Sequence, residues 1–261
     1  HMDKPTLAEM FHSLTTEQPF TPPEHWRQGR TAYGGFSSAM ALQIALNHLS
    51  QQHPPLKAAQ IAFIGPVTEQ VSFQVDTLRQ GKSATQVAVD ARVDNAIVLR
   101  AGFTFASPRE SSIHHHYVEC PQVEPPEHYS SIPKKLPVPN FFKNFDIRLV
   151  SQSMFFSGGE TPELLAWVRL EGLSKISAEV ALLLIGDCLP PASTVCFKSL
   201  APISSMNWTV DFTQPAEHSE WYLVRSFSLV AAGGYSYQSM QVWNKQGELV
   251  LSGTQTVAIF A

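Results

Sequence analysis

Two segments of the chain are apolar around nearly their whole circumference when they are read with a helical period. The first is residues 33–49, where Tyr33-Gly34-Gly35-Phe36 leads into SSAMALQIALNHL, and the second is residues 177–192, SAEVALLLIGDCLPPA. A helix without a polar face has to be covered by other structure on every side. The pattern therefore predicts two buried helices, each at the centre of its own half of the chain.

Segments with strand character follow the first helix. In one of them Val87, Val89, Ala91 and Val93 alternate with more polar residues, which is typical of an antiparallel strand with one face on a core. Turn-forming residues separate the segments. We expect an antiparallel meander around the helix, made of AAQIAFIGP, VSFQVDTLRQG, KSATQVAVDARVDN and AIVLRAGFTFAS.

The second half repeats this pattern. FFKNFDIRLV and ELLAWVRLEG precede the second helix, and MNWTVDF, EWYLVRSFSLVAAGG, YSYQSMQVWNKQG and ELVLSGTQTVAIF follow it. Between the halves, residues 107–139 are rich in Pro, Ser and charged residues, which is typical of a surface linker. We therefore expect an α+β protein of two tandem units, residues 3–108 and 138–261, joined by a linker at residues 109–137.

The two halves can be aligned on each other, with LRQGKSATQVAV over VAAGGYSYQSMQ. The alignment predicts an internal duplication, in which each of two equal units is a central helix wrapped by an antiparallel sheet. The pairs that it superposes are Gly81 with Gly233, Gln86 with Gln238, and Val98-Leu99 with Val250-Leu251.

The composition narrows the classes of partner. The chain has 261 residues, a hydrophobic content of 44% and a net charge of -4, so it can bury a large core but has no basic stripe for nucleic acid. No apolar run reaches the roughly 18 residues that a membrane-spanning helix needs. We interpret His1-Met2 as a tag remnant and residues 3–14 as a short amphipathic helix, and we expect no signal peptide.

The cysteines and histidines indicate neither a disulfide nor a metal site. Cys120, Cys188 and Cys196 are odd in number and form no CxxC motif, which favours a reducing cytoplasm. His114-His115-His116 is interpreted as part of a solvated polar loop and not as a set of metal ligands. We therefore expect no metal and no organic cofactor.

The alignment of the halves also locates a difference in polarity. Aspartate inside an apolar helix is costly unless it is hydrogen-bonded, so the second half is predicted to carry a polar site that the first half lacks. In the structural alternative, the aspartate caps the loop after its helix or sits at an exposed helix end, and the glutamine faces solvent. The superposed pairs are Asp187 on Asn47, Gln255 on Phe103 and, in a looser register, Ser205 on Leu56.

Several motifs, each modest alone, occur in an order and spacing that are specific together. They are Tyr33-Gly34-Gly35, Phe63-Ile64-Gly65-Pro66, Leu78-Arg79-Gln80-Gly81-Lys82-Ser83, Asp187, Glu220-Trp221 and Ser252-Gly253-Thr254-Gln255. With them the chain resembles the acyl-CoA thioesterase II family over most of its length outside the linker. The resemblance implies a double-hotdog fold, hydrolysis of acyl-CoA to fatty acid and free CoA, and a homo-oligomer, either a dimer or a tetramer.

The resemblance also implies a site. In the family an Asp, a Ser or Thr, and a Gln bind the attacking water. Asp187 and Gln255 map onto two of these positions, and the hydroxyl position falls on Ser205, with Ser204 and Thr209 as neighbouring alternatives.

The residue types at these positions predict a mechanism. Asp187 is expected to take a proton from a water that Ser205 and Gln255 hold in line with the thioester carbonyl. Backbone amides near Gly35, or before the second helix, are expected to stabilise the oxyanion. A serine nucleophile is not expected, because the chain has no G-x-S-x-G motif.

Two other functions stay open at this point. A dehydratase of 3-hydroxyacyl thioesters would pair an acid with a histidine, but the second helix has none and His218 falls in an expected loop. A non-catalytic acyl-chain or acyl-CoA binding protein is the other alternative, because Asn207-Trp208 replaces the family's usual aspartate-histidine pair. The substrate-binding residues and the acyl chain length are not predicted.

Overall fold

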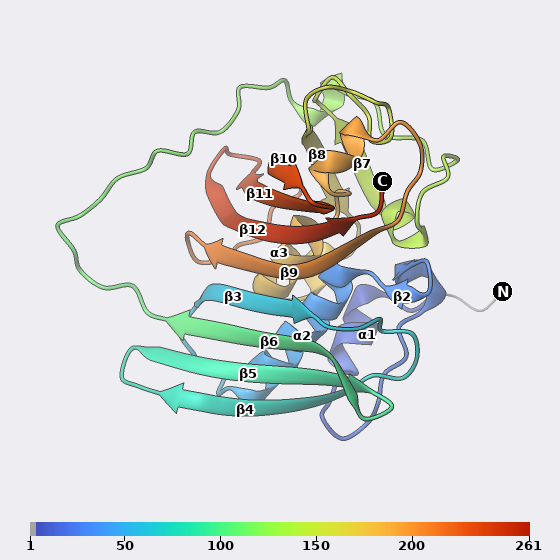
Figure 1. Ribbon diagram of the computed structural model, residues 1–261. Coiled ribbons are helices and arrows are strands. Elements are labelled where there is room, and N and C mark those ends of the chain that lie inside the picture. Colours follow the sequence, from blue (N-terminus) through green and yellow to red (C-terminus); the bar gives the residue numbers. More distant parts are fainter. Residues whose placement is uncertain (1–3) are drawn as a thin grey trace.

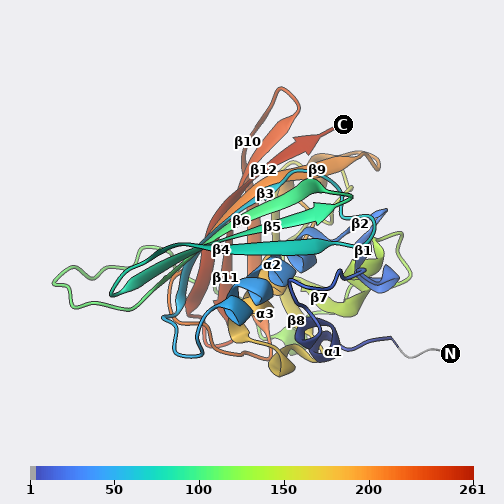
Figure 2. The same ribbon diagram turned by 90° about the horizontal axis from the view of Figure 1, so that it is seen from below.

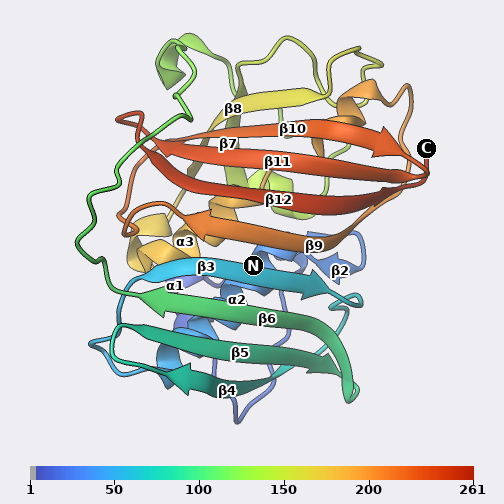
Figure 3. The same ribbon diagram turned by 60° about the vertical axis from the view of Figure 1, so that its left-hand side comes forward.

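The computed structural model describes residues 4–261, so the expected tag remnant His1-Met2 and the first expected domain residue, Asp3, lie outside the described part. Over the described residues, ten strands form one antiparallel sheet in the order β4-β5-β6-β3-β9-β12-β11-β10-β8-β7 (Figures 1 and 3). The expected α+β class is confirmed. The strands are β3 (Leu56–Phe63), β4 (Ser72–Gln80), β5 (Ala84–Val93), β6 (Ala96–Ala106), β7 (Phe145–Leu149), β8 (Glu163–Leu170), β9 (Ile203–Phe212), β10 (Tyr222–Ala232), β11 (Tyr235–Asn244) and β12 (Leu249–Ile259).

Two helices, α2 (Gly34–His48) and α3 (Ala178–Gly186), pack against each other on one face of this sheet (Figure 2). Nearly all of α2 up to Ala45 is buried, and so is every residue of α3 from Val180 onward. The prediction of two buried central helices is therefore confirmed. A third helix, α1 (Leu7–His12), begins at Thr6, whose hydroxyl accepts a hydrogen bond from the N–H of Glu9.

The helix α3 is shorter than expected. It was predicted to reach Ala192, but it ends at Gly186, and Asp187 is its C-cap with φ -108° and ψ 11°. Pro190 and Pro191 explain the early end, because proline has no N–H for the helical ladder and disfavours helical backbone in the residue before it. A short 3-10 helix, η5 (Ala192–Cys196), follows instead.

The strand order differs from the expected meander at one strand. β4, β5 and β6 are consecutive neighbours, as expected, but β3 pairs with β6 and not with β4. The N–H groups of Ile64 and Gly65 both donate to the carbonyl of Val98 at the start of β6. The chain is thereby turned across the end of the sheet before it enters β4.

The two halves are unequal, contrary to expectation. The first contributes four strands to the sheet and the second six, counted over residues 4–261. The FFKN segment, expected as a strand, forms the 3-10 helix η3 (Asn140–Asn144), and only β7 after it is extended. The other short elements are β1 (Arg27–Gln28) paired with β2 (Thr31–Ala32), and the 3-10 helices η1 (Glu24–Trp26), η2 (Pro126–His128) and η4 (Leu173–Lys175).

The strand ladders identify equivalent positions in the two halves. Ser205 pairs with Val257 beside a bulge, and in the first half Leu56 pairs with Phe105 beside a bulge at the same place. These bulges superpose Ser205 on Leu56, as expected. They also superpose Gln255 on Phe103, as expected, because these residues lie two positions before Val257 and Phe105 respectively.

At one strand the ladders correct the alignment by one residue. Gln238 pairs with Gln255, whereas the residue that pairs with Phe103 is Val87. Gln238 therefore superposes on the buried Val87 and not on the exposed Gln86. The shift arises because the turn from β11 to β12 is one residue longer than the turn from β5 to β6.

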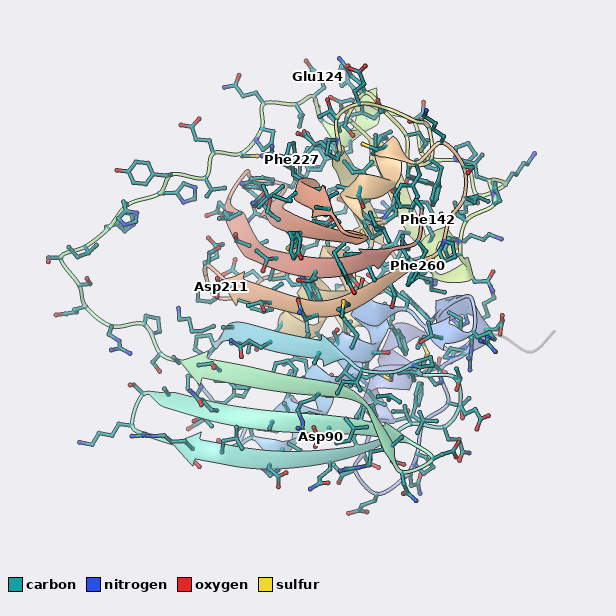
Figure 4. The ribbon with its side chains drawn as sticks, in the orientation of Figure 1. Asp90, Glu124, Phe142, Asp211, Phe227 and Phe260 are labelled. Carbon is teal, nitrogen blue, oxygen red and sulfur yellow. The ribbon has the colours of Figure 1, made fainter. Side chains whose placement is uncertain are left out.

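The linker leaves the end of β6 and reaches the second half in a wide arc that stands clear of the strands (Figure 1). Residues 107–119 are all exposed. Further on, Cys120, Val123 and Tyr129 pack on a cluster of the sheet's outer face that includes Trp167 and Trp243. Elsewhere this outer face carries charged side chains, such as Asp90 on β5 and the exposed Asp211 on β9 (Figure 4).

Candidate active site

A pocket of about 670 Å³ opens where the first turn of α2 meets the end of α3. Both halves of the chain line it, so it lies at their junction. Its lining is largely apolar and aromatic, as expected for a site that holds an apolar ligand with a few placed polar groups. The aromatic residues are Tyr33, Phe63, Phe141, Phe142 (labelled in Figure 4), Phe155 and Phe156.

Asp187 lies in the wall of this pocket, directly after α3. Its Oδ1 accepts a hydrogen bond of 2.6 Å from Nε2 of Gln255. The N–H of Gly35, in the first turn of α2, also faces the carboxylate, and the positive end of a helix dipole favours a negative charge there. The alternative of an exposed helix end is therefore wrong, because Asp187 is held between α2 and β12.

The ionisation of Asp187 is shifted by these surroundings. Burial raises its pKa to about 7, while the hydrogen bonds from Gln255 and Gly35 oppose that rise. Loss of hydration disfavours the charged form more than two hydrogen bonds restore it. A carboxylate with a pKa near neutrality can both accept and release a proton under ordinary conditions, which is the property of a general base.

Gln255 faces the interior, not the solvent, and only 5% of it is exposed. Its Oε1 accepts a hydrogen bond of 3.3 Å from the hydroxyl of Ser205, while its Nε2 donates to Asp187. The amide therefore links the hydroxyl to the carboxylate in one hydrogen-bonded chain. The structure thus brings together the three side chains that the sequence analysis singled out.

The bulge in β9 determines which hydroxyl enters the pocket. Trp208 is fully buried on the inner face, and strict alternation would place Met206 beside it and turn Ser205 outward. Because the ladder skips Met206, Ser205 points inward next to Gln255 and Met206 is exposed. Of the two alternatives, Thr209 is exposed on the outer face, and Ser204 is also exposed although it reaches the pocket rim.

The two glycines that open α2, Gly34 and Gly35, allow a close approach between the halves. Neither glycine has a positive φ, and both are helical. A Cβ on Gly34 would lie 2.9 Å from Oδ2 of Asp187 and 3.3 Å from the ring of Phe63. The hydroxyl of Ser38 donates to the carbonyl of Gly34, and that of Ser37 has no partner among residues 4–261.

Tyr33 holds the two helix ends together. Its hydroxyl donates a hydrogen bond of 2.6 Å to the carbonyl of Leu184 near the end of α3, where carbonyls lack helical partners. Burial, with the nearby charge of Asp187, raises the pKa of Tyr33 well above its usual value. Tyr33 is therefore a neutral donor that fixes the end of α3, and with it the position of Asp187.

Asn207 and Trp208, where the resemblance suggested an aspartate-histidine pair, have structural contacts. Asn207 is exposed and accepts a hydrogen bond from the N–H of Thr256. Trp208 is fully buried, and a Cβ on Gly186 would lie only 3.0 Å from its ring. Trp208 therefore supports the last turn of α3 from below, although its indole N–H has no partner among the described residues.

Gln238 was not singled out as a site residue from the sequence. It lines the pocket with 5% exposure, directly opposite Gln255 in the ladder. Its Oε1 accepts a hydrogen bond of 2.7 Å from the N–H of Ala192. The one-residue error in the alignment superposed it on Gln86 and concealed it. The correct register would have revealed a second polar residue where the first half has an apolar one.

The corresponding positions of the first half form no such chain. Leu56 and Phe103 are buried apolar residues. Asn47 is exposed near the end of α2, where its amide donates to the carbonyl of Leu14 and its oxygen accepts from Gln43.

Over residues 4–261, no group of three or more His, Cys, Asp or Glu side chains is placed to hold a metal ion. His114-His115-His116 lies exposed in the linker. Within the same range, the helices are too short or too polar to span a membrane.

Comparisons with known proteins give consistent matches along the chain. Residues 22–106 match the family model of the acyl-CoA thioesterase N-terminal domain, and residues 117–259 match that of the acyl-CoA thioesterase C-terminal domain. Acyl-CoA thioesterase 2 of Haemophilus influenzae is 21% identical over 250 residues, which cover 87% of this chain and 86% of that protein.

Solved structures share the fold. A protein of unknown function with a hot dog fold from Alicyclobacillus acidocaldarius has a TM-score of 0.83 at 23% identity, and the match covers 93% of this chain and 92% of that one. The acyl-CoA thioesterase II TesB2 of Mycobacterium marinum has a TM-score of 0.70 at 18% identity, with 87% and 89% covered. The expected hotdog fold is thereby confirmed.

Proposed function

The chain belongs to the acyl-CoA thioesterase family, and we propose that it hydrolyses acyl-CoA to a free fatty acid and CoA in the pocket beside Asp187. The observation that carries the assignment of the site is the hydrogen-bonded chain from Ser205 through Gln255 to Asp187. It ends at a carboxylate that burial makes basic enough to accept a proton near neutral pH. The aromatic lining supplies a surface for an acyl chain.

In the proposed reaction, water is the nucleophile. Asp187 accepts one proton from it while the water oxygen bonds to the carbonyl carbon and the carbonyl electron pair moves onto oxygen. Ser205 and Gln255 hold the water in line. The carbonyl then re-forms, the carbon–sulfur bond breaks, and the departing CoA thiolate takes the proton from Asp187. The products are a carboxylic acid and CoA with its thiol.

Asp187→Asn tests this assignment of the base. The substitution is nearly isosteric and can still accept the hydrogen bond from Gln255, but a neutral amide cannot take a proton from water. We expect release of CoA from a panel of acyl-CoAs to fall by roughly 10²–10⁴-fold. Gln255→Ala and Ser205→Ala are expected to have milder effects. Asp211→Asn, on the exposed outer face of β9, is the matched control and should leave turnover unchanged.

We also propose one site per chain. The first half has Asn47, Leu56 and Phe103 in place of the proposed base, hydroxyl and amide. Asn47→Ala should therefore change turnover by no more than a few-fold. If folded Asp187→Asn keeps about half of the wild-type rate, a second site is present and the proposal is wrong.

The two other functions predict different results. A dehydratase would need a histidine at the site, but none of the described residues that line the pocket is a histidine, and His218 is exposed. A binding protein would retain acyl-CoA without releasing CoA. Wild-type protein that binds acyl-CoA but releases no CoA from any member of the panel would therefore favour the binding function.

We further propose a homo-oligomer, a dimer or a tetramer, in the cytoplasm. The sheet ends in the edge strands β4 and β7, and unpaired edges and broad sheet faces favour assembly. Cys120, Cys188 and Cys196 are all free thiols, which favours a reducing compartment. A monomeric mass by light scattering at micromolar concentration would contradict the oligomer.

A further inference from the structure

Gln238 places an amide at the pocket in an orientation that its own contacts determine. The N–H of Ala192 is a donor, so the atom that it meets at 2.7 Å must be the side-chain oxygen. The amide nitrogen, Nε2, is consequently turned away from Ala192. Unlike a freely rotating amide, this one has its donor and acceptor ends assigned by chemistry.

The nitrogen of this amide faces the pocket. Nε2 of Gln238 has no hydrogen-bond partner among the described residues. It is not one of the fully buried polar atoms that lack a partner, so it is accessible to solvent. Gln238 is only 5% exposed and lines the pocket. Since the pocket is where the residue reaches solvent, the two N–H donors of Nε2 are available to a molecule inside it.

The location of this donor matches the proposed chemistry. Gln238 stands directly opposite Gln255 in the ladder, and side chains opposite each other in adjacent strands lie about 5 Å apart at Cβ. Gln255 holds the carboxylate of Asp187. A carbonyl attacked by a water at Asp187 therefore has Gln238 within reach.

The sequence suggested two backbone positions for the donor. The start of α3 does not line the pocket, and the N–H of Gly35 is already engaged. The N–H of Gly35 faces the carboxylate of Asp187 and lowers its pKa, so it serves the base. An oxyanion needs donors that are held in place before the reaction begins. Gln238 supplies such a donor, because Ala192 fixes its oxygen and the β11–β12 ladder fixes its backbone.

We propose that Nε2 of Gln238 donates a hydrogen bond to the thioester carbonyl oxygen and stabilises the oxyanion that forms when water adds to the carbonyl carbon. The assignment rests on the proposed hydrolysis of acyl-CoA. It gives the two facing glutamines separate roles: Gln255 holds the base and the water, and Gln238 holds the carbonyl.

Two substitutions separate this role from support of the loop at Ala192. Gln238→Met keeps the length of the side chain but removes both the donor and the acceptor. Gln238→Glu keeps an acceptor for Ala192 and removes only the donors. Gln241→Met, on the same strand and facing away from the pocket, is the matched control. For each folded variant, kcat and KM for acyl-CoA are measured across pH, and the plateau kcat values are compared.

We expect both Gln238 variants to lose about 10²-fold or more in plateau kcat, with KM within a few-fold of wild type. Gln241→Met should match wild type. Comparing plateaus removes the shift that the added charge of Gln238→Glu causes in the pH at which Asp187 ionises. That charge also repels an oxyanion, so the loss due to the missing donor alone is taken from the uncharged Gln238→Met.

Three outcomes would overturn the assignment. In the first, Gln238→Glu keeps the wild-type plateau kcat while Gln238→Met loses it, which would mean that Gln238 acts only by holding Ala192. In the second, both variants keep wild-type kcat. In the third, KM rises while kcat stays at the wild-type value, which would mean that Gln238 contributes only to binding of the ground state. Inactive wild-type protein would instead overturn the hydrolysis on which the assignment rests.

A structural measurement avoids the need for Gln238 variants that fold. Asp187→Asn, expected to be inactive, can be crystallised with an acyl-CoA in the pocket. The thioester oxygen should lie about 2.7–3.2 Å from Nε2 of Gln238. A carbonyl directed away from that nitrogen, with no hydrogen bond to it, would contradict the proposal.

Discussion

The ionisation of Asp187 is expected to control how turnover depends on pH. Its carboxyl has a pKa of about 7 because burial disfavours the charge, and only the deprotonated form can accept a proton from water. We therefore expect kcat/KM to rise with pH through about 7 and to level off above it. Initial rates of CoA release across this range test the expectation. A profile that is flat there, or that rises near the usual pKa of aspartate, would contradict it.

The raised pKa of Asp187 should also make stability depend on pH. Stability should fall as pH rises, whereas turnover should rise. The pKa of Asp187 is raised from 3.8 to about 7 on folding, so between these values the folded protein holds a proton that the unfolded chain releases. Its contribution to stability is complete below pH 3.8 and is lost as pH rises to about 7, by up to about 4 kcal/mol.

Asp187→Asn removes this titration. At a pH above 7 the variant should have a higher free energy of unfolding than the wild type, because it does not bury a charge. The difference should shrink as pH falls toward 4. Urea unfolding of both proteins at several pH values measures it, and a variant that is less stable at every pH would contradict the expectation.

Single residues also mark the limit of prediction from sequence. Asp187 and Gln255 were found because each differs in polarity from its counterpart in the other half. Ser205 could not be separated from Ser204 and Thr209, because the bulge that turns it inward depends on the pairing of β9 with β12. Gln238 was missed for a similar reason, since one extra residue in a turn shifts the alignment of a whole strand.

The start of α2 should tolerate no side chain at its first position. A Cβ on Gly34 would lie 2.9 Å from Oδ2 of Asp187 and 3.3 Å from the ring of Phe63, so the carboxylate must move away from its partners. We expect Gly34→Ala to lower kcat by about tenfold or more. Gly102→Ala is the matched control, because its Cβ would meet nothing within 4 Å.

Folding must be compared before this result is interpreted. Alanine favours a helix more than glycine by about 1 kcal/mol, so Gly34→Ala should remain folded by circular dichroism. A variant that is folded and fully active would mean that the carboxylate has room to move without losing its function.

The ends of secondary elements were harder to predict than their presence. Both buried helices and every strand after α3 occur where the apolar pattern placed them. The end of α3 was placed too late, because apolar periodicity continues into a segment whose prolines prevent a helix. FFKN was assigned to a strand as the first part of FFKNFDIRLV, but Phe141 and Phe142 are buried from a 3-10 helix beside the pocket.

The linker is expected to be the first site of cleavage in the whole molecule. Residues 109–137 were predicted as the linker, and the exposed residues 107–119 are its most accessible part, whereas the segment around Val123 packs on the sheet. Brief digestion, followed by mass spectrometry, should give two fragments that separate within this stretch. Early cleavage inside β3 to β6 or β9 to β12 would contradict the expected boundaries of the two units.

The large-scale arrangement was largely predictable, because a duplicated pattern of helix and strands permits few packings. Two features were not. The pairing of β3 with β9, which joins the halves into one sheet, leaves no local signal at Ala59 or Val210. The two additional strands of the second half depend on β8 pairing with β10 far along the chain.

The pairing of β3 with β9 also suggests that the chain can work as a split enzyme. Five residue pairs join these strands, while the base comes from the second half and the glycine that faces it comes from the first. If the chain is divided within residues 107–119, neither fragment contains a whole pocket. Each fragment alone should be inactive, and mixing the two should restore CoA release with second-order kinetics. The rate at which activity returns would then measure how fast two separate sheets join into one through β3 and β9.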